Sequence, residues 1–261
     1  MLSRRNLLRS LASTAAPLVA MSTIDPGGRA NAAEPPVAPV AAAAANWSYD
    51  VRPHIDPDLK AHGAIFERKI HKIGENVYSA VGWADGNCVM VVGDDGVIIV
   101  DTGPDLASAN EVAAEFRRIT DKPVRAVIYT AFHVDHINGV KAFVSAEGVK
   151  AGQVAIIAHE TLLTNVIRSS AMIGPILGMR TAYNFGAGLG GADIEGMNLG
   201  NGPLNPAPSV APSFIAPTRT FSTTLDITIA GVAMNLVHVP SGAADQIAVF
   251  LPSTMSCCPR R

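Results

Sequence analysis

The stretch Val124-Arg125-Ala126-Val127-Ile128-Tyr129-Thr130-Ala131-Phe132-His133-Val134-Asp135-His136-Ile137-Asn138-Gly139 decides the fold. Its first seven residues are mostly apolar and rich in β-branched side chains, which indicates a buried strand. A His-x-Asp-His pattern follows where the strand ends and a helix is expected to begin. Because loops at strand ends face solvent and substrate, two imidazoles and a carboxylate at this place can converge on one or two metal ions.

The chain before this stretch predicts an antiparallel sheet. β-Branched runs occupy residues 77–81, 89–92 and 97–100, and the Asp-Gly pair between the last two marks a hairpin. Apolar residues at three- and four-residue spacing then predict a helix over residues 106–118. Sheet hairpins followed by a strand-helix-strand unit indicate a layered α/β (α+β) domain.

The chain after this stretch predicts further helices and strands. The expected elements are a helix over 137–145, a strand over 154–158, a helix over 159–170, a hairpin formed by 225–229 and 232–239, and a strand over 246–251. Between them, residues 186–220 are rich in Gly, Pro and Asn and predict a long loop. A loop of this length usually serves a site.

Several segments together resemble the alkyl sulfatases of the metallo-β-lactamase fold. They are Thr130-x-x-His133-x-Asp135-His136-x-x-Gly139, Asn76-Val77-Tyr78, and residues 93–103, 135–141, 156–160 and 180–189. The resemblance runs from about residue 65 to residue 252. It implies an αββα sandwich, incomplete in its C-terminal half because the strands that close the second half would follow residue 252.

The resemblance also implies a zinc site with one or two ions. By position, His133 serves the first metal, Asp135 and His136 serve the second, and Asp101 lies beside them as a supporting carboxylate. Asp135 would also position the water that attacks the substrate. His238 falls where many members of the superfamily place another histidine on the first metal; alternatively, it caps the end of its strand.

The resemblance also implies two residues that bind the substrate. Arg180 and Tyr183 match a segment that lies near the sulfate in alkyl sulfatases, so they are candidates for holding a small anionic ester, and Tyr183 is also a candidate catalytic residue. The alternatives are that Tyr183 is a packed aromatic residue and Arg180 a solvated charge.

The metal ligands depart from the family pattern at two positions. Ala131 stands where the first histidine of His-x-His-x-Asp-His is normal, and Gly242 stands in the segment that normally supplies a glutamate ligand. Asp245 is the carboxylate nearest to that segment. These departures put occupancy of the first metal position in doubt.

The two ends of the chain differ in composition from its body. Residues 1–32 predict a signal peptide of the twin-arginine type, because Arg4-Arg5 precedes a moderately apolar run and a small-residue cleavage pattern. Residues 33–45 predict a disordered Pro/Ala spacer, residues 46–252 the folded domain, and residues 253–261 a tail unlike the family. The protein is therefore expected in the periplasm or outside the cell.

Charge and cysteine content narrow the list of partners. The net charge is −2, and no Lys/Arg block follows the leader, which argues against nucleic acid or an anionic membrane as the main partner. The apolar run of the leader is too short and too interrupted for a stable membrane anchor.

The cysteine content predicts no disulfide framework, since the chain has only Cys88, Cys257 and Cys258. A missing closing half would leave an apolar sheet face and an unpaired edge, so a homo-oligomer that covers them is a further expectation.

Three functional hypotheses follow. The first is an exported, metal-dependent hydrolase that cleaves sulfate esters of alcohols with a metal-activated water. The second is a catalytically impaired or inactive truncated member of the family, which Ala131, Gly242 and the tail suggest. The third keeps hydrolysis but changes the substrate to a lactone, thioester or β-lactam, because the fold does not fix one reaction.

Overall fold

The computed structural model describes residues 57–184, 202–203 and 213–252 of the 261-residue chain. All of these residues belong to one compact unit that spans residues 43–261. The predicted signal peptide and spacer, the C-terminal segment with two of the cysteines, and most of the predicted long loop lie outside the described residues. For these segments, and for export and oligomeric state, the expectations stay predictions.

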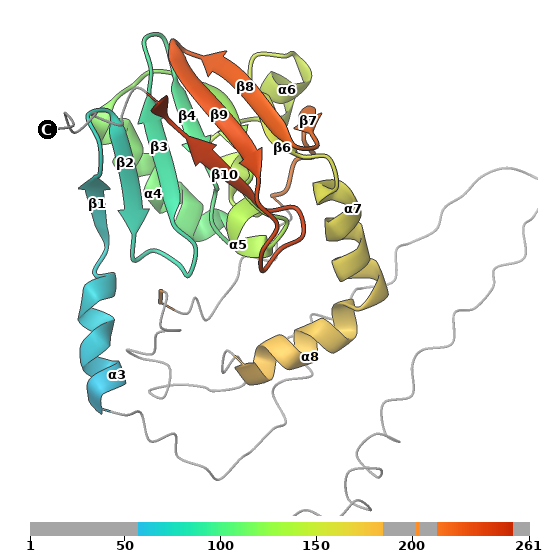
Figure 1. Ribbon diagram of the computed structural model, residues 1–261. Helices are drawn as coiled ribbons and strands as arrows, with labels where there is room; N and C mark the ends of the chain where they lie inside the picture. The colour runs from blue at the N-terminus through green and yellow to red at the C-terminus, as the bar shows by residue number, and fades with distance from the viewer. Residues whose placement is uncertain (1–56, 185–201, 204–212, 253–261) are drawn as a thin grey trace, which may run out of the picture. The chain divides into compact units, whose positions relative to one another are not determined.

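A seven-stranded sheet forms the centre of the described part of the chain (Figure 1). Its strands follow one another in chain order and are β1 (Lys69–Lys72), β2 (Val77–Val81), β3 (Cys88–Val92), β4 (Val97–Val100), β5 (Val124–Ile128), β6 (Ala155–His159) and β7 (Arg219–Phe221). The first four strands pair antiparallel, whereas β4 to β7 pair parallel. The carboxyl ends of β4, β5 and β6 therefore meet at one edge.

A smaller antiparallel sheet lies against one face of the large sheet and in front of it in Figure 1. Its strands are β8 (Thr224–Ile229), β9 (Val232–His238) and β10 (Ile247–Phe250), in the order β10-β9-β8. Backbone bonds tie it to the large sheet at both ends: Asp94 N–H donates to the Ala230 carbonyl, and Ile247 N–H donates to the Thr130 carbonyl. The predicted hairpin and final strand are confirmed.

The described helices are mostly short. They are α3 (Pro57–His62), η1 (Gly63–Phe66), α4 (Leu106–Ile119), α5 (Val134–Ile137), η2 (Val140–Ala142), α6 (Ala146–Lys150), α7 (Leu162–Ile167), the π-helical turn η3 (Arg168–Met172) and α8 (Gly174–Asn184). The longest, α4, begins at Asp105, whose buried carboxylate accepts hydrogen bonds from the N–H groups of Ala107 and Ser108. This N-cap fixes where the predicted helix starts.

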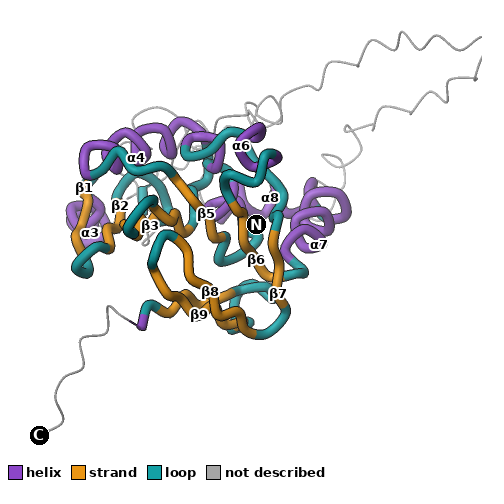
Figure 2. The backbone as a smooth tube through the Cα atoms, turned by 90° about the horizontal axis from the view of Figure 1, so that it is seen from above, coloured by secondary structure: helices purple, strands orange, loops and turns teal. Residues whose placement is uncertain are grey.

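Alternate side chains of the large sheet fill two separate cores. Ile99, Val127 and Tyr129 point to the side of α4, where they pack with Val112 and Phe116. On the other face, their neighbours in the sequence pack against the small sheet; Ile98, Ala126, Ile128, Met234, Leu236 and Ile247 belong to this second core. Figure 2 shows the resulting order, with α4 and α6 on one side of the strands and β8 and β9 on the other. The layered α/β class predicted from the sequence is confirmed.

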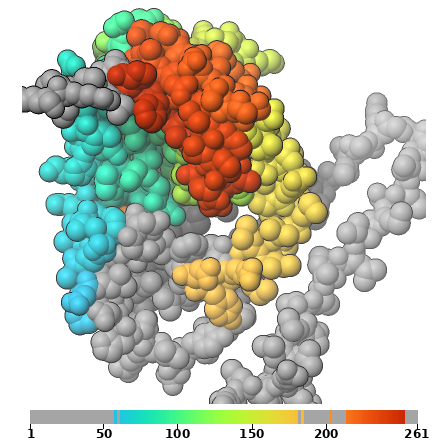
Figure 3. All heavy atoms as spheres, in the orientation of Figure 1, coloured from blue at the N-terminus to red at the C-terminus, as the bar shows by residue number. Residues whose placement is uncertain are grey.

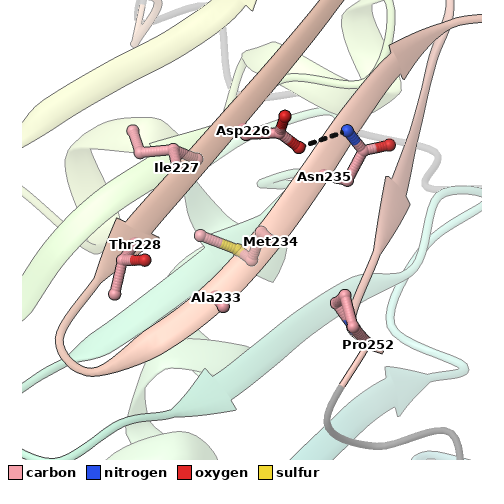
Figure 4. Close-up of a pocket in the computed structure, with 7 residues that line it drawn as sticks. All are labelled: Asp226, Ile227, Thr228, Ala233, Met234, Asn235 and Pro252. Carbon is pink, nitrogen blue, oxygen red and sulfur yellow. Dashed lines mark hydrogen bonds between the residues drawn. The ribbon is translucent and has the colours of Figure 1, made fainter.

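The outer face of the small sheet lies at the surface, as the orange-red side chains in Figure 3 show. Polar and apolar residues together line a shallow hollow of about 270 Å³ there: Asp226, Thr228 and Asn235 with Ile227, Ala233, Met234 and Pro252. Within it, Asn235 donates to Asp226 at 2.6 Å (Figure 4). Among the described residues of this face, the large exposed apolar side chain is Phe250. The outward side chains of this face are thus mixed in polarity, and the expectation of a homo-oligomer that covers a sheet face stays a prediction.

The helix predicted over residues 137–145 is wrong, because the chain there forms α5, η2 and α6 instead. The physical reason lies at Gly139, which presses against the end of β4: a Cβ at this position would stand 1.9 Å from the Thr102 carbonyl oxygen. A continuous helix cannot follow a backbone that must turn at this contact. The contact leaves His133 and Asp135 at the very start of a short helix.

The helix predicted from residue 159 is also displaced. His159 is the last residue of β6 and pairs with Phe221 of β7, so the helix starts only at Leu162. Helix α8 was not predicted, since Gly174, Pro175 and Gly178 weaken a helical pattern. No single described helix could span a membrane; the apolar segments Leu162–Met172 and Gly174–Arg180 pass a length and composition test only as a pair bent by 81°.

The contact at Gly139 makes a stability prediction. We expect Gly139→Ala to lower the free energy of unfolding by about 1–3 kcal/mol, the usual cost of overpacking a filled site. The control is Gly178→Ala in α8, where an added Cβ meets no atom within 4 Å; this change should be neutral or slightly stabilising. Urea unfolding of both variants checks the prediction, and equal effects would contradict it.

Candidate metal centre

The predicted ligands lie at the carboxyl edge of the large sheet, where β4 and β5 end side by side. Asp101 directly follows β4. After β5, His133 is the N-cap residue of α5, and Asp135 and His136 lie within that short helix. The Thr102 N–H and hydroxyl both donate to the His136 carbonyl, at 2.8 and 3.0 Å. These two bonds fasten α5 to the end of β4.

Asp101 has a left-handed backbone, with φ of 57°, which is uncommon outside glycine but tolerated by aspartate. This conformation turns its carboxylate back toward β5. One oxygen accepts the Thr130 N–H at 2.8 Å, and the other accepts the Thr130 hydroxyl at 2.5 Å and lies 2.8 Å from Nδ1 of His136. The buried carboxylate is thus fully used in holding the next strand and one imidazole.

The contact with Asp101 decides which nitrogen of His136 is open to a metal. The Asp101 carboxylate accepts a hydrogen bond from Nδ1–H, so Nε2 is the nitrogen that can give its lone pair to a metal once its own proton has left. Nε2 lies 3.2 Å from the Asp135 carboxylate. One ligand atom each from His133, Asp135 and His136 falls within 4.8 Å of the others. Imidazole nitrogen and carboxylate oxygen are the donors that zinc takes in proteins, so these residues fit the metal that the resemblance implies.

The same charges act on the proton of His136. Burial alone lowers the pKa of this imidazole, but the hydrogen bond and charge of Asp101, followed by the charges of Asp135 and Asp85, raise its pKa to about 9. Without a metal, His136 therefore carries a positive charge at neutral pH. A cation at the site would take the place of that proton.

Asp85 is a residue near the site that the sequence did not single out. It lies on the loop between β2 and β3, next to Gly86, where an added Cβ would stand 2.6 Å from the Asp135 carbonyl oxygen. Burial and then the charge of Asp135 raise the pKa of the Asp85 carboxyl above its ordinary value. Its distance from the ligands in the sequence hides this proximity, although a glycine directly after it was a usable signal for close approach.

His238 lies apart from the group of three. Its ring stacks on that of His159, with centroids 3.9 Å apart, and its Nε2 lies 2.8 Å from the Ala244 carbonyl. His159 is buried at the end of β6, between the Thr161 hydroxyl and the Ser222 carbonyl. In this arrangement both the ring face and Nε2 of His238 have partners at the end of its strand, and its role as a metal ligand stays a prediction.

Arg180 and Tyr183 both lie on α8, and both side chains are exposed. Close to them on the same helix, Ile176, Leu177 and Met179 are also exposed. The helix therefore presents one cation, one phenol and several apolar groups to its surroundings.

The two positions that depart from the family pattern have different surroundings. Ala131 is buried, with 3% of its surface exposed, whereas a Cβ at Gly242 would meet nothing within 4 Å. Asp245 is buried, and neither of its carboxylate oxygens has a hydrogen-bond partner. The open space at residue 242 could take a glutamate, but a histidine at residue 131 would have to displace packed neighbours.

Comparison with known proteins identifies a family. Residues 81–234 match the model of the metallo-beta-lactamase superfamily. The chain is 53% identical over 163 residues to a linear primary-alkylsulfatase of Pseudomonas sp. (strain ATCC 19151), which covers 62% of this chain and 30% of that protein. It is 32% identical over 186 residues to an alkyl/aryl-sulfatase of Saccharomyces cerevisiae, which covers 70% of this chain and 28% of that protein.

A solved structure shows the same fold. The stereoselective inverting sec-alkylsulfatase of Pseudomonas sp. superposes with a TM-score of 0.68 at 20% sequence identity. The match covers 76% of this chain and 32% of that protein. The chain thus spans about three tenths of the length of these alkylsulfatases.

The environment of His136 makes a pH prediction for the metal-free protein. Because its pKa is raised to about 9 on folding, the bound proton stabilises the folded state fully below about pH 6.5, and this contribution is lost as the pH rises through about 9. We expect the free energy of unfolding to fall by up to about 3 kcal/mol over that interval. Urea unfolding in the presence of EDTA measures this dependence.

Two variants test whether His136, and not another titrating group, causes this pH dependence. Asp101→Asn removes the negative charge that raises the pKa of His136, so the fall between these pH values should become smaller. Asp121→Asn changes an exposed carboxylate that precedes β5, at the opposite edge of the sheet. This control should leave the fall in the free energy of unfolding unchanged. An unaltered pH dependence in Asp101→Asn would contradict the assignment.

Proposed function

The chain belongs to the metallo-β-lactamase superfamily, and on that premise we propose that it is a zinc-dependent hydrolase of alkyl sulfate esters. The observation that carries this proposal is the convergence of His133, Asp135 and His136 at the carboxyl edge of the sheet, with Asp101 behind them. The similarity to alkylsulfatases over most of the described chain supports the sulfate ester as substrate. The net reaction consumes one water and gives an alcohol and hydrogensulfate.

Each residue of the centre has a separate task in this proposal. His133, Asp135 and His136 hold zinc, and when bound, zinc supplies Lewis acidity that lowers the pKa of a nearby water. Asp101 holds the proton on Nδ1 of His136 and so keeps Nε2 available. The Asp135 carboxylate accepts a hydrogen bond from the attacking water and orients it toward the ester.

Helix α8 is proposed to bind the substrate. The guanidinium of Arg180 is suited to the sulfate group, because it forms charge-assisted hydrogen bonds with oxyanions. Tyr183 offers a phenolic hydroxyl to the same group. The exposed apolar side chains Ile176 and Leu177 fit an alkyl chain, which favours a sulfate ester of a long-chain alcohol over a lactone, thioester or β-lactam.

The proposed function makes a prediction about zinc content and activity together. We expect the purified protein to contain zinc and to release sulfate from dodecyl sulfate. His136→Ala should lose both properties, because it removes the one imidazole that Asp101 orients, while His71→Ala on the exposed strand β1 should keep both. Elemental analysis and a sulfate assay measure the outcome; wild-type protein without zinc and without sulfate release would refute the proposal.

The second candidate function is that of a catalytically impaired member of the family. Buried Ala131 and open Gly242 favour it, since neither can bind a metal. In that case, Gly242→Glu alone or with Ala131→His should raise the zinc content and the rate of sulfate release above those of the wild type. The same assays measure this. Full activity of the unchanged chain would contradict impairment.

A further inference from the structure

The segment from α7 to α8, residues 162–184, holds most of the large exposed apolar side chains of the described chain. Figure 3 shows it at the surface of the molecule, in yellow. Soluble proteins rarely leave many such groups together in water, and where they do, the groups mark an interaction site. The exposed side chains of this kind are Leu163, Ile167, Met172, Ile173, Ile176, Leu177, Met179 and Tyr183.

Helix α7 is apolar on two sides, of which one is covered. Leu162 is fully buried, and Val166, four residues later, packs against the first hydrophobic core. Leu163 and Ile167 repeat this spacing one residue further along, and both are exposed. A helix that is apolar on more than one side is normally buried on all of them. Core packing covers one side of α7 and leaves Leu163 and Ile167 in contact with solvent.

Helix α8 depends even less on the body of the protein. None of its described residues belongs to a hydrophobic core of the described chain. It has 11 residues and contains Gly178, whereas isolated helices shorter than about 12–15 residues are marginal in water and an interior glycine weakens them further. Ile176, Leu177 and Arg180 share one side of the helix at three- and four-residue spacing. An apolar surface that met this side would stabilise the helix.

The charge of this segment is of one sign. Between Glu160 and Asp193 the charged residues are Arg168 and Arg180, in a chain whose net charge is −2. Both arginines are exposed, and neither takes part in an ion pair among the described residues. Exposed apolar side chains combined with cations and without acids are typical of helices that lie on an anionic membrane surface.

The same charges decide between two possible occupants of the segment. In a two-fold contact with a second copy, the segment would meet itself. Arg168 and Arg180 would then approach their own counterparts, and the segment offers no carboxylate to neutralise them. A bilayer that contains anionic lipid provides both an apolar interior and negative head groups. Charge complementarity therefore favours the lipid surface.

We propose that the segment from α7 to α8 is a docking surface for a bilayer that contains anionic lipid. Its apolar side chains enter the interface, and the guanidinium groups of Arg168 and Arg180 lie among the head groups, with their methylene stems along the apolar side. Two arginines are too few to hold the protein by charge alone, so the docking is reversible and depends mainly on apolar contact. The inference is independent of zinc and of ester hydrolysis.

A local fluorescence reporter tests the docking in the full chain. Met172 is 74% exposed on the proposed surface, and Ile73, in the loop after β1, is 63% exposed away from it. With phosphatidylglycerol vesicles, Met172→Trp should shift its emission to shorter wavelength, because the added indole leaves water, whereas Ile73→Trp should not. Pure phosphatidylcholine vesicles should give a much smaller shift. Because the reporter is local, lipid binding by another part of the chain does not produce this difference.

Two further variants separate apolar contact from charge. Ile167→Ser should raise the dissociation constant for phosphatidylglycerol vesicles about tenfold, the effect of withdrawing one isoleucine side chain from an apolar phase; Ile73→Ser is its control. Arg168→Gln should raise it about fivefold and reduce its dependence on salt. Arg118→Gln, which removes an exposed guanidinium from α4, should change neither. Vesicle sedimentation measures these constants, and circular dichroism checks that each variant is folded.

Several outcomes would overturn the proposal. Equal emission shifts with both kinds of vesicle, or equal shifts in Met172→Trp and Ile73→Trp, would exclude this segment as a surface for anionic lipid. Self-association without vesicles that is lost in Ile167→Ser would show that a second copy covers the segment. Zinc content and sulfate release test the proposed function separately. A chain that docks without hydrolysis upholds this inference alone, and one that hydrolyses without docking upholds the proposed function alone.

Discussion

The carboxylate of Asp101 is the constraint on which the site and much of the surrounding fold depend. It is buried at the end of β4 and joins three groups of the next segment: the Thr130 N–H, the Thr130 hydroxyl and Nδ1 of His136. The left-handed backbone of Asp101 aims it there. Because an unpaired buried carboxylate is costly, the end of β5 and the imidazole are held in place by the same requirement.

The adjoining contacts show how packing and chemistry share this edge of the sheet. Thr102, the next residue, holds the His136 carbonyl, and Gly139 lets the chain turn against the Thr102 carbonyl. On the other face, Ile247 N–H donates to the Thr130 carbonyl and ties the small sheet to the same point. The two sheets and the segment that carries His133, Asp135 and His136 therefore meet where the metal would bind. Packing in both hydrophobic cores thus supports the positions of these side chains.

The charge at this place exceeds what the metal-free fold needs. Asp101 and Asp135 lie beside the imidazole of His136, and their charges, with a smaller contribution from Asp85, raise its pKa to about 9. In the metal-free protein the proton on His136 balances part of this negative charge, and a bound cation would take its place. The proposed zinc chemistry thus follows from this imbalance. The absent ligands at Ala131 and Gly242 affect another part of the site and leave this imbalance in place.

The sequence by itself indicated eight of the ten described strands, the longest helix and the grouping of His133, Asp135 and His136, because these follow from local periodicity and from residue types that stand next to one another. It missed β1 and β7, which are short, and the start of β7 fell within the predicted loop. Val124 to Gly139 predicted the strand, its end and the metal-binding edge together. Only the tertiary structure decided the broken helix after Asp135, the pairing of His238 with His159 and the approach of the β2–β3 loop to Asp135. The reason is physical: each of these depends on a contact between segments far apart in the chain, and a contact such as Gly139 against Thr102 leaves no local pattern.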